Sequence, residues 1–177
     1  MRQQPHSTED AAADAPLQQW LVEQGFPPDN VNALVANGTS ALMRASHHGR
    51  SAVVHMLIAA GARLATRNAD GNNALWFACI ANRLDIIDML IDAGIDIDNR
   101  NDNGATPLMY AASAGRDDIV DRLLAHGADT AAETLDGFTA LDLAATRECL
   151  ALLRRASRAR LVAETLGTTF EVVQLSS

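Results

Sequence analysis

The fold is decided by the stretch Asn103-Gly104-Ala105-Thr106-Pro107-Leu108-Met109-Tyr110-Ala111-Ala112-Ser113-Ala114-Gly115, because versions of it recur along the chain. Its glycine returns every 33 residues, at Gly38, Gly71, Gly104 and Gly137. Its leucine keeps the same step, at Leu42, Leu75, Leu108 and Leu141. A period of this length is typical of a solenoid, in which each unit packs only against its neighbours.

The segment Thr106–Ala111 resembles the ankyrin-repeat signature T-P-L-H-x-A, with Met109 in the His position. The resemblance covers about Asn30 to Ala156. It implies an all-α ankyrin-repeat solenoid of paired antiparallel helices with β-hairpin-like finger turns. It also implies a non-enzymatic module that binds another protein through its concave face, as an accessory or regulatory partner.

The composition adds expectations about the source and compartment of the protein. The chain has no lysine, and by analogy such an arginine-only composition suits a small stand-alone bacterial protein. No apolar segment near the N-terminus resembles a secretory signal, so we expect a cytoplasmic protein. Cys79 and Cys149 fall at helical positions otherwise occupied by small or apolar residues, which indicates buried reduced thiols.

Charge is unevenly distributed along the chain, whose net charge is −8. Residues 68–146 carry fourteen acidic residues and four arginines, whereas residues 147–160 carry five arginines and one glutamate. An acidic body repels phosphate, so we expect neither nucleic-acid nor membrane partners. The basic run has two interpretations: a helix C-terminus, where cations complement the dipole, or a contact with an anionic partner.

The repeats divide the chain into three regions. Residues 1–15 are polar and aperiodic and are expected to form a disordered leader. The ankyrin domain spans 16–156, with a helix that starts at Pro16. The C-terminal region, 157–177, is a helix extension and a tail. Within the domain we expect an N-terminal half-repeat cap (16–36), repeats at about 37–69, 70–102 and 103–135, and a capping repeat (136–156).

Each repeat shows the same local signals. Polar residues start the inner helices by accepting a backbone N–H, at Ser40, Asn73, Thr106 and Thr139. Gly49, Asn82 and Gly115 are expected to end these helices in a left-handed conformation. The capping repeat is three residues shorter than the others between its two leucine positions.

The tail is the least determined part of the chain. Residues 157–166 are expected to extend the final helix, and Thr168–Leu175 is partly alternating and β-prone. Three alternatives follow for the tail: it folds back over the cap, it self-associates through Phe170–Leu175, or it is disordered.

The sequence shows no catalytic constellation, metal site or cofactor motif. His47 and His48 are adjacent, and neighbours on a helix point about 100° apart, so they do not converge on one metal ion. Asp92–Asp98 resembles a calcium loop only superficially, because it lacks the spaced Gly and the final Glu.

The register of the repeats instead places a set of variable residues on the expected partner-binding face. These are Arg44, His47, His48, Asn72, Phe77, Asp102, Tyr110, Ser113, Leu135 and Phe138. Aromatic residues are frequent interface anchors, so Phe77, Tyr110 and Phe138 are the main candidates; the alternative is that they fill gaps between inner helices. The competing functions are a homo-oligomeric scaffold assembled through the tail and, less favoured, a metal-binding or enzymatic protein.

Overall fold

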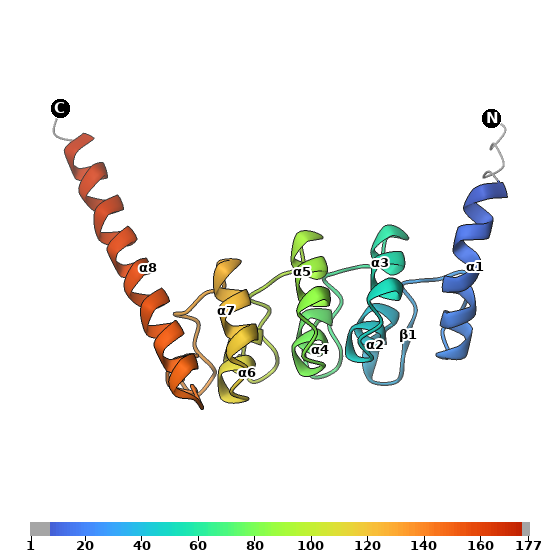
Figure 1. The fold of residues 1–177 in the computed structure, drawn as a ribbon, viewed down its shortest axis with the longest axis horizontal. Coiled ribbons are helices and arrows are strands. Elements are labelled where there is room, and N and C mark those ends of the chain that lie inside the picture. Colours follow the sequence, from blue (N-terminus) through green and yellow to red (C-terminus); the bar gives the residue numbers. More distant parts are fainter. Residues whose placement is uncertain (1–7, 175–177) are drawn as a thin grey trace. The chain divides into compact units, whose positions relative to one another are not determined.

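A computed structural model describes residues 8–174 of the chain. The chain divides into two compact units, Met1–Asp96 and Ile97–Ser177. The first contains α1 (Thr8–Glu23), β1 (Leu34–Val35), a 3-10 turn (Ala36–Gly38), β2 (Thr39–Ser40), α2 (Ala41–His47), α3 (Ser51–Ala59), α4 (Ala74–Ile80) and α5 (Leu84–Asp92). The second contains α6 (Pro107–Ser113), α7 (Asp117–Ala125) and α8 (Arg147–Gln174). The elements are labelled in Figure 1.

The first helix is longer than its sequence indicates. The predicted start at Pro16 is wrong, because α1 begins at Thr8 and Pro16 lies inside it. Alanines and early acidic residues favour helix here, although proline cannot donate the usual bond to the carbonyl four residues earlier. Residues 1–7 of the predicted leader lie outside the described residues.

In the first unit, α2 with α3 and α4 with α5 form two helical pairs, visible side by side in Figure 1. The inner helices start as predicted. Ser40 accepts a hydrogen bond from the N–H of Met43 at 3.2 Å, and Asn73 accepts from the N–H groups of Leu75 and Trp76. The core consists of fully buried aliphatic side chains, among them Leu42, Leu57, Leu75, Ile86 and Leu90.

The finger turns are hairpins, of which one is a regular strand pair among the described residues. β1 and β2 are antiparallel, with Leu34 opposite Ser40 and Val35 opposite Thr39. The next finger of the first unit is closed by two backbone bonds: the N–H of Asn68 donates to the carbonyl of Asn72, and the N–H of Gly71 donates to the carbonyl of Asn68, both at 3.0 Å. The two fingers are joined by the N–H of Ala69, which donates to the carbonyl of Asn37 at 2.9 Å.

In the second unit, α6 and α7 repeat the same pair, and α7 packs against α8. Thr106 caps α6 by accepting from the N–H of Met109 at 3.3 Å, and Pro107 occupies the first helical turn. Leu108, Met109, Ile119 and Leu123 are fully buried. Inner and outer helices thus bury the leucine and aliphatic positions that recur in the sequence.

The last repeat differs from the prediction at its inner helix. Thr139 does accept a bond from the N–H of Asp142, at 3.3 Å, but only a turn follows and α8 begins at Arg147. The capping repeat is three residues shorter than the others, which leaves too few residues for an inner helix and its connection to α8. The N–H of Ala145 instead donates to the carbonyl of Ala112, at 3.0 Å, at the end of α6.

The tail also differs from the prediction. The extension over 157–166 is confirmed, and α8 continues to Gln174, so the β-prone segment from Thr168 to Gln174 is helical rather than extended. Once a helix is nucleated each further residue adds a hydrogen bond at small cost, whereas an isolated strand has nothing to pair with. Residues 175–177 lie outside the described residues. Within residues 8–174, no helix combines the length and apolar composition that crossing a bilayer requires.

Candidate protein-binding surface

Three predicted residues of the first unit come together across two inner helices. His47 and His48 end α2 and are exposed. The ring of His47 lies edge-on to that of Phe77 on α4, with centroids 5.8 Å apart and an interplanar angle of 86°. Phe77 is half-buried by this contact. The two histidine rings are 5.8 Å apart and tilted. This is an aromatic cluster with a polar edge.

Arg44 is predicted on the same face, but the structure ties it to the end of α1. Its guanidinium donates to the carbonyl of Gln24 at 2.6 Å and lies 5.0 Å from the centre of the buried Phe26 ring. Both contacts hold the chain after α1 against α2. We therefore assign Arg44 a role in attaching α1 rather than in binding a partner.

Asn72 lies in a finger that is organised by another residue, Asn68. The Oδ1 of Asn68 accepts from the N–H groups of Asp70 and Asn72, at 3.1 and 2.9 Å. Asn101 makes the corresponding bonds to Asn103 and Ala105, both at 3.0 Å. Sequence reasoning missed these two residues, although they stand 33 positions apart like the finger glycines.

The finger at Thr134–Phe138 carries the largest exposed apolar side chains of the predicted set. Leu135 is 76% exposed and Phe138 50%. Thr134 closes this loop twice: its N–H donates to the carbonyl of Phe138 at 2.9 Å, and its hydroxyl accepts from the N–H of Phe138 at 3.1 Å. The N–H of Leu135 donates to the carbonyl of Asn103 at 3.0 Å. Two apolar side chains are thus exposed on a loop that is fixed by hydrogen bonds.

The remaining predicted residues of the second unit lie on α6 and on the preceding finger. Tyr110 is half-buried, and Ser113 is exposed and donates its hydroxyl to the carbonyl of Tyr110 at 3.0 Å. Asp102 is exposed at its finger tip, as is Asp136 beside Phe138. The surface of this unit therefore combines apolar anchors with carboxylates.

A cluster of electrostatic contacts lies outside the predicted set of surface residues, at the starts of the outer helices. Arg83 donates to both carboxylate oxygens of Asp85, at 3.0 and 2.8 Å, and to the hydroxyl of Ser51 at 2.7 Å. The bonds from Arg83 and a further bond from the Ser51 hydroxyl lower the pKa of Asp85 from 3.8 to about 2. Arg83 also donates to the carbonyl of Gly49. The cluster links the start of α5 to that of α3, a structural role.

In the second unit a comparable contact fixes the start of α8. One oxygen of Asp117 accepts from the hydroxyl of Thr146 and from the N–H and thiol of Cys149. Hydrogen bonding to Cys149 lowers the pKa of Asp117, and burial raises the pKa of the Cys149 thiol. Cys79 is also buried, and desolvation raises its pKa to about 12. Both thiols are buried, as predicted.

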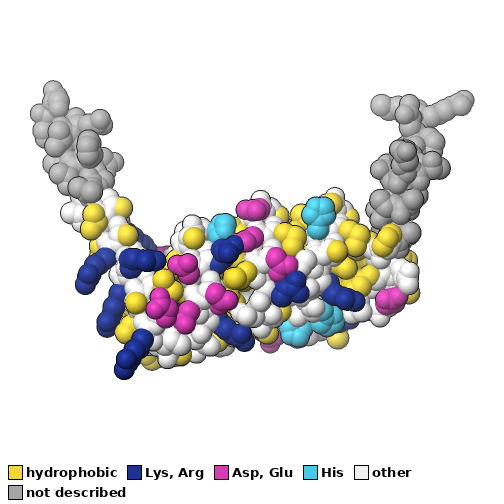
Figure 2. All heavy atoms as spheres, viewed as in Figure 1, with side chains coloured by type: hydrophobic (Ala, Val, Ile, Leu, Met, Phe, Trp, Pro, Cys, Tyr) yellow, Lys and Arg dark blue, Asp and Glu magenta, His cyan; other side chains and the backbone are white. Residues whose placement is uncertain are grey.

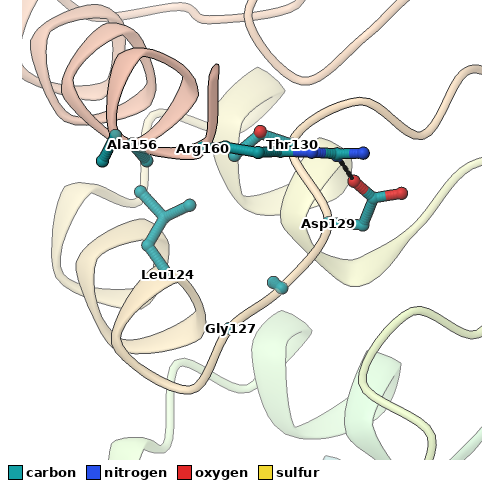
Figure 3. A pocket seen from close by; sticks show the side chains of 8 residues that line it. Leu124, Gly127, Asp129, Thr130, Ala156 and Arg160 are labelled. Atoms are coloured by element: carbon teal, nitrogen blue, oxygen red, sulfur yellow. Dashed lines mark hydrogen bonds and ion pairs between the residues drawn. The ribbon is translucent and has the colours of Figure 1, made fainter. Parts of the chain in front are cut away.

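The second unit also has two open grooves beside α8, both of which are lined in part by Thr130 and Arg160. One, of about 430 Å³, is lined by Leu124, Gly127 and Ala156 among others. Figure 3 shows the ion pair between Arg160 and Asp129 at its margin. The other, of about 280 Å³, includes Thr130, Leu141 and Leu161. In the part of the chain that the structure describes, no group of three His, Cys, Asp or Glu side chains is placed to hold a metal ion.

Two family models match the chain. The model described as "Ankyrin repeats (3 copies)" matches residues 10–101, and that described as "Ankyrin repeats (many copies)" matches residues 90–144. A search of curated proteins found no match. The first model alone covers more than half of the chain, and both agree with the helical pairs and finger turns described above. The chain therefore belongs to the ankyrin-repeat family and has its all-α solenoid fold.

Proposed function

We propose that this protein is a non-enzymatic recognition module that binds another protein and acts as its accessory or regulatory partner in the cytoplasm. Ankyrin repeats are in general protein–protein interaction modules, and the finger at Thr134–Phe138 supports that role here. Leu135 and Phe138 are exposed on a loop that is fixed by hydrogen bonds of Thr134 and Leu135, and neither side chain is part of the buried core. Covering such side chains contributes about 25 cal/mol per Å².

The partner surface is expected to be apolar at its centre and basic or mixed around it. Asp102 and Asp136 are exposed next to the apolar finger, and the chain as a whole carries a net charge of −8. Complementary charge speeds the encounter and disfavours wrong partners more than it adds affinity. In the first unit, His47, His48 and Phe77 offer a second contact region of mixed aromatic and polar character.

The proposal is tested by placing a photo-reactive phenylalanine analogue at position 138 and recovering cross-linked proteins from the native organism. A matched probe at Val22 serves as control, because Val22 is similarly exposed, at 58%, but lies on α1. We expect a discrete cross-linked protein from position 138 alone, lost when Leu135→Ala and Tyr110→Ala are added. The melting temperature should stay nearly unchanged in the Leu135→Ala variant. Equal cross-linking from both positions would reject the finger as the binding surface.

A homo-oligomeric scaffold built through the C-terminal region is the second candidate. The sequence favoured this function because a β-prone segment could pair with that of a second copy. That argument no longer holds, because the region is helical to Gln174. The observation that still favours it is the exposure of Leu161 and Val162, at 62% and 58%. The cross-link from position 138 would then recover a second copy of this chain only if the finger took part in that assembly.

A further inference from the structure

The arginines of the C-terminal region do not have the position that the helix dipole would favour. α8 has 28 residues, against 9 in each of α3, α5 and α7, and Arg147 is its first residue. The basic run therefore occupies the first half of the helix rather than its C-terminus. Cations near a helix N-terminus are unfavourable, so the dipole interpretation is wrong.

Among the residues that the structure describes, ion pairs account for two of these five arginines. Arg155 lies 3.6 Å from Asp121, and Arg160 pairs with Asp129. The other three, Arg147, Arg154 and Arg158, are exposed and make no hydrogen bond or ion pair to any described residue. Figure 2 shows dark blue side chains gathered along α8.

These three arginines form one stripe on the helix. At 100° per residue, positions 147, 154 and 158 fall within about 40° of one another. At 1.5 Å per residue, they are separated by about 10 and 6 Å along the axis. We refer to Arg147, Arg154 and Arg158 as the arginine stripe. Such a row can meet carboxylates spaced by one and two turns on another segment.

An apolar groove borders the stripe. Leu161 lies three residues after Arg158 and seven after Arg154, so it continues the same side of α8. Its side chain is 62% exposed and lines the groove of about 280 Å³ together with Ala131, Leu141 and other residues. A groove of this size admits an aliphatic side chain from a partner.

We propose that the arginine stripe and this groove form a second interaction surface, which docks an acidic segment of a partner protein. Carboxylates of the segment pair with the arginines, and one of its apolar side chains enters the groove beside Leu161. Charge complementarity supports this occupant, because the stripe is a row of three exposed positive side chains without an ion-pair partner among the described residues.

The acidic residues elsewhere in the second unit argue against nucleic acid or an anionic membrane as the partner of the stripe. Screening extends over about 8 Å at physiological salt, so duplex DNA or an anionic bilayer would also meet the acidic residues of the second unit. Asp118, Asp121, Asp136 and Asp142 are exposed in this unit. A short acidic segment confined to α8 avoids that repulsion.

The experiment measures binding of a fluorescent helical peptide with the repeat Glu-Glu-Leu-Leu to the full chain by polarisation. Its counterpart with the repeat Lys-Lys-Leu-Leu controls for apolar association. The test variant is Arg154→Glu/Arg158→Glu. The matched control is Arg50→Glu/Arg63→Glu, which makes the same charge change at two exposed arginines of the first unit.

We expect the wild type to bind the acidic peptide and not the basic one. The test variant should bind it about tenfold more weakly, because two ion pairs become repulsive, and the matched control should bind it as the wild type does. Leu161→Ser should also weaken binding. Leu135→Ala/Phe138→Ala should not, which separates this surface from the finger surface. Circular dichroism checks folding, and Arg154→Gln/Arg158→Gln replaces the test variant if the latter unfolds.

Three results would overturn the proposal. They are no binding of the acidic peptide by the wild type, equal losses in the test variant and its matched control, and equal binding of both peptides. Tighter binding to phosphatidylserine vesicles or duplex DNA than to the peptide, lost in the same test variant, would also overturn it by assigning the stripe to those anions.

Discussion

At the scale of single residues, the ends of the inner helices follow from the sequence. Asn82 stands 33 residues from both Gly49 and Gly115 and shares their left-handed backbone, with φ of 55°. Asparagine adopts this conformation more readily than other residues that carry a side chain. The prediction for Asn82 is therefore confirmed, and its physical basis is the backbone and not a contact of the amide.

Substitutions at two of these equivalent positions should differ in their effect on stability. Asn82→Gly should change the free energy of unfolding by less than about 0.5 kcal/mol, because glycine also tolerates positive φ. Gly115→Ala should cost more than about 1 kcal/mol, because φ is 65° and a Cβ would lie 2.9 Å from the methyl of Thr146. Urea unfolding of both variants measures the difference. A large loss for Asn82→Gly would show that its side chain stabilises the fold.

Other residues could not be placed from the sequence, because their roles depend on the path of a connecting segment. Arg44 has the register of a surface residue, yet it bonds to Gln24, twenty positions earlier, and covers Phe26. The loop after α1 determines that contact, and no periodicity describes this loop. By contrast, Ser40, Asn73 and Thr106 cap their helices as predicted, because capping needs only residues within one helical turn.

At the scale of elements, the outer helices are joined at their starts by contacts that the repeat pattern does not predict. Ser51 opens α3, and its hydroxyl donates to Asp85 in the first turn of α5. Arg83 bonds to both residues. Asp85 also suits its position, since a carboxylate near a helix N-terminus is favourable. One carboxylate thus links two neighbouring outer helices.

This link makes the stability of the first unit depend on pH. The pKa of Asp85 is lowered to about 2, so its contribution is fully present above about pH 4 and is lost as the pH falls towards 2. At pH 7, Asp85→Asn should reduce the free energy of unfolding by less than about 1 kcal/mol, because the pair is partly exposed. The difference between the wild type and the variant should be much smaller near pH 2, where the Asp85 carboxyl of the folded protein is about half protonated.

Denaturant titrations at both pH values provide the measurement. Asp92→Asn, at an exposed position in the last turn of the same helix, is the control. A carboxylate is unfavourable at that end, so its removal should cause no loss at either pH. If the difference between Asp85→Asn and the wild type were as large near pH 2 as at pH 7, the carboxylate would not be its source.

The longest element, α8, shows why local propensity fails at the end of a chain of repeats. Thr168–Leu175 has β-branched residues in partial alternation, and the sequence pattern favours a strand. Strand formation needs a partner, whereas the preceding Arg147–Ala163 is rich in Leu, Ala and Arg and already helical. Propagation of that helix prevails over the local β-preference.

At the scale of the whole molecule, the repeat period determines the fold, but the two proposed binding surfaces depend on features that differ between repeats. The fingers share a backbone, yet only the one at Thr134–Phe138 displays both an exposed leucine and an exposed phenylalanine. The outer helices share their buried aliphatic face, yet only α8 carries the arginine stripe. Family membership thus gives the architecture, and individual side chains carry the two proposed functions.

The oligomeric state tests which of these features act in the isolated protein. We expect the full chain to be a monomer at low and high concentration, because its net charge of −8 is repulsive and Leu161 and Val162 offer little apolar area. A stable dimer interface buries about 1,200 Å² or more. A chain that ends at Ala156 should also be monomeric and folded, since it retains the buried Cys149, Leu152 and Leu153. Light scattering coupled to size exclusion gives both masses, and circular dichroism should show less helix in the shorter chain. A dimer that forms only with the full chain would instead establish the C-terminal half of α8 as a self-association element and favour the homo-oligomeric scaffold.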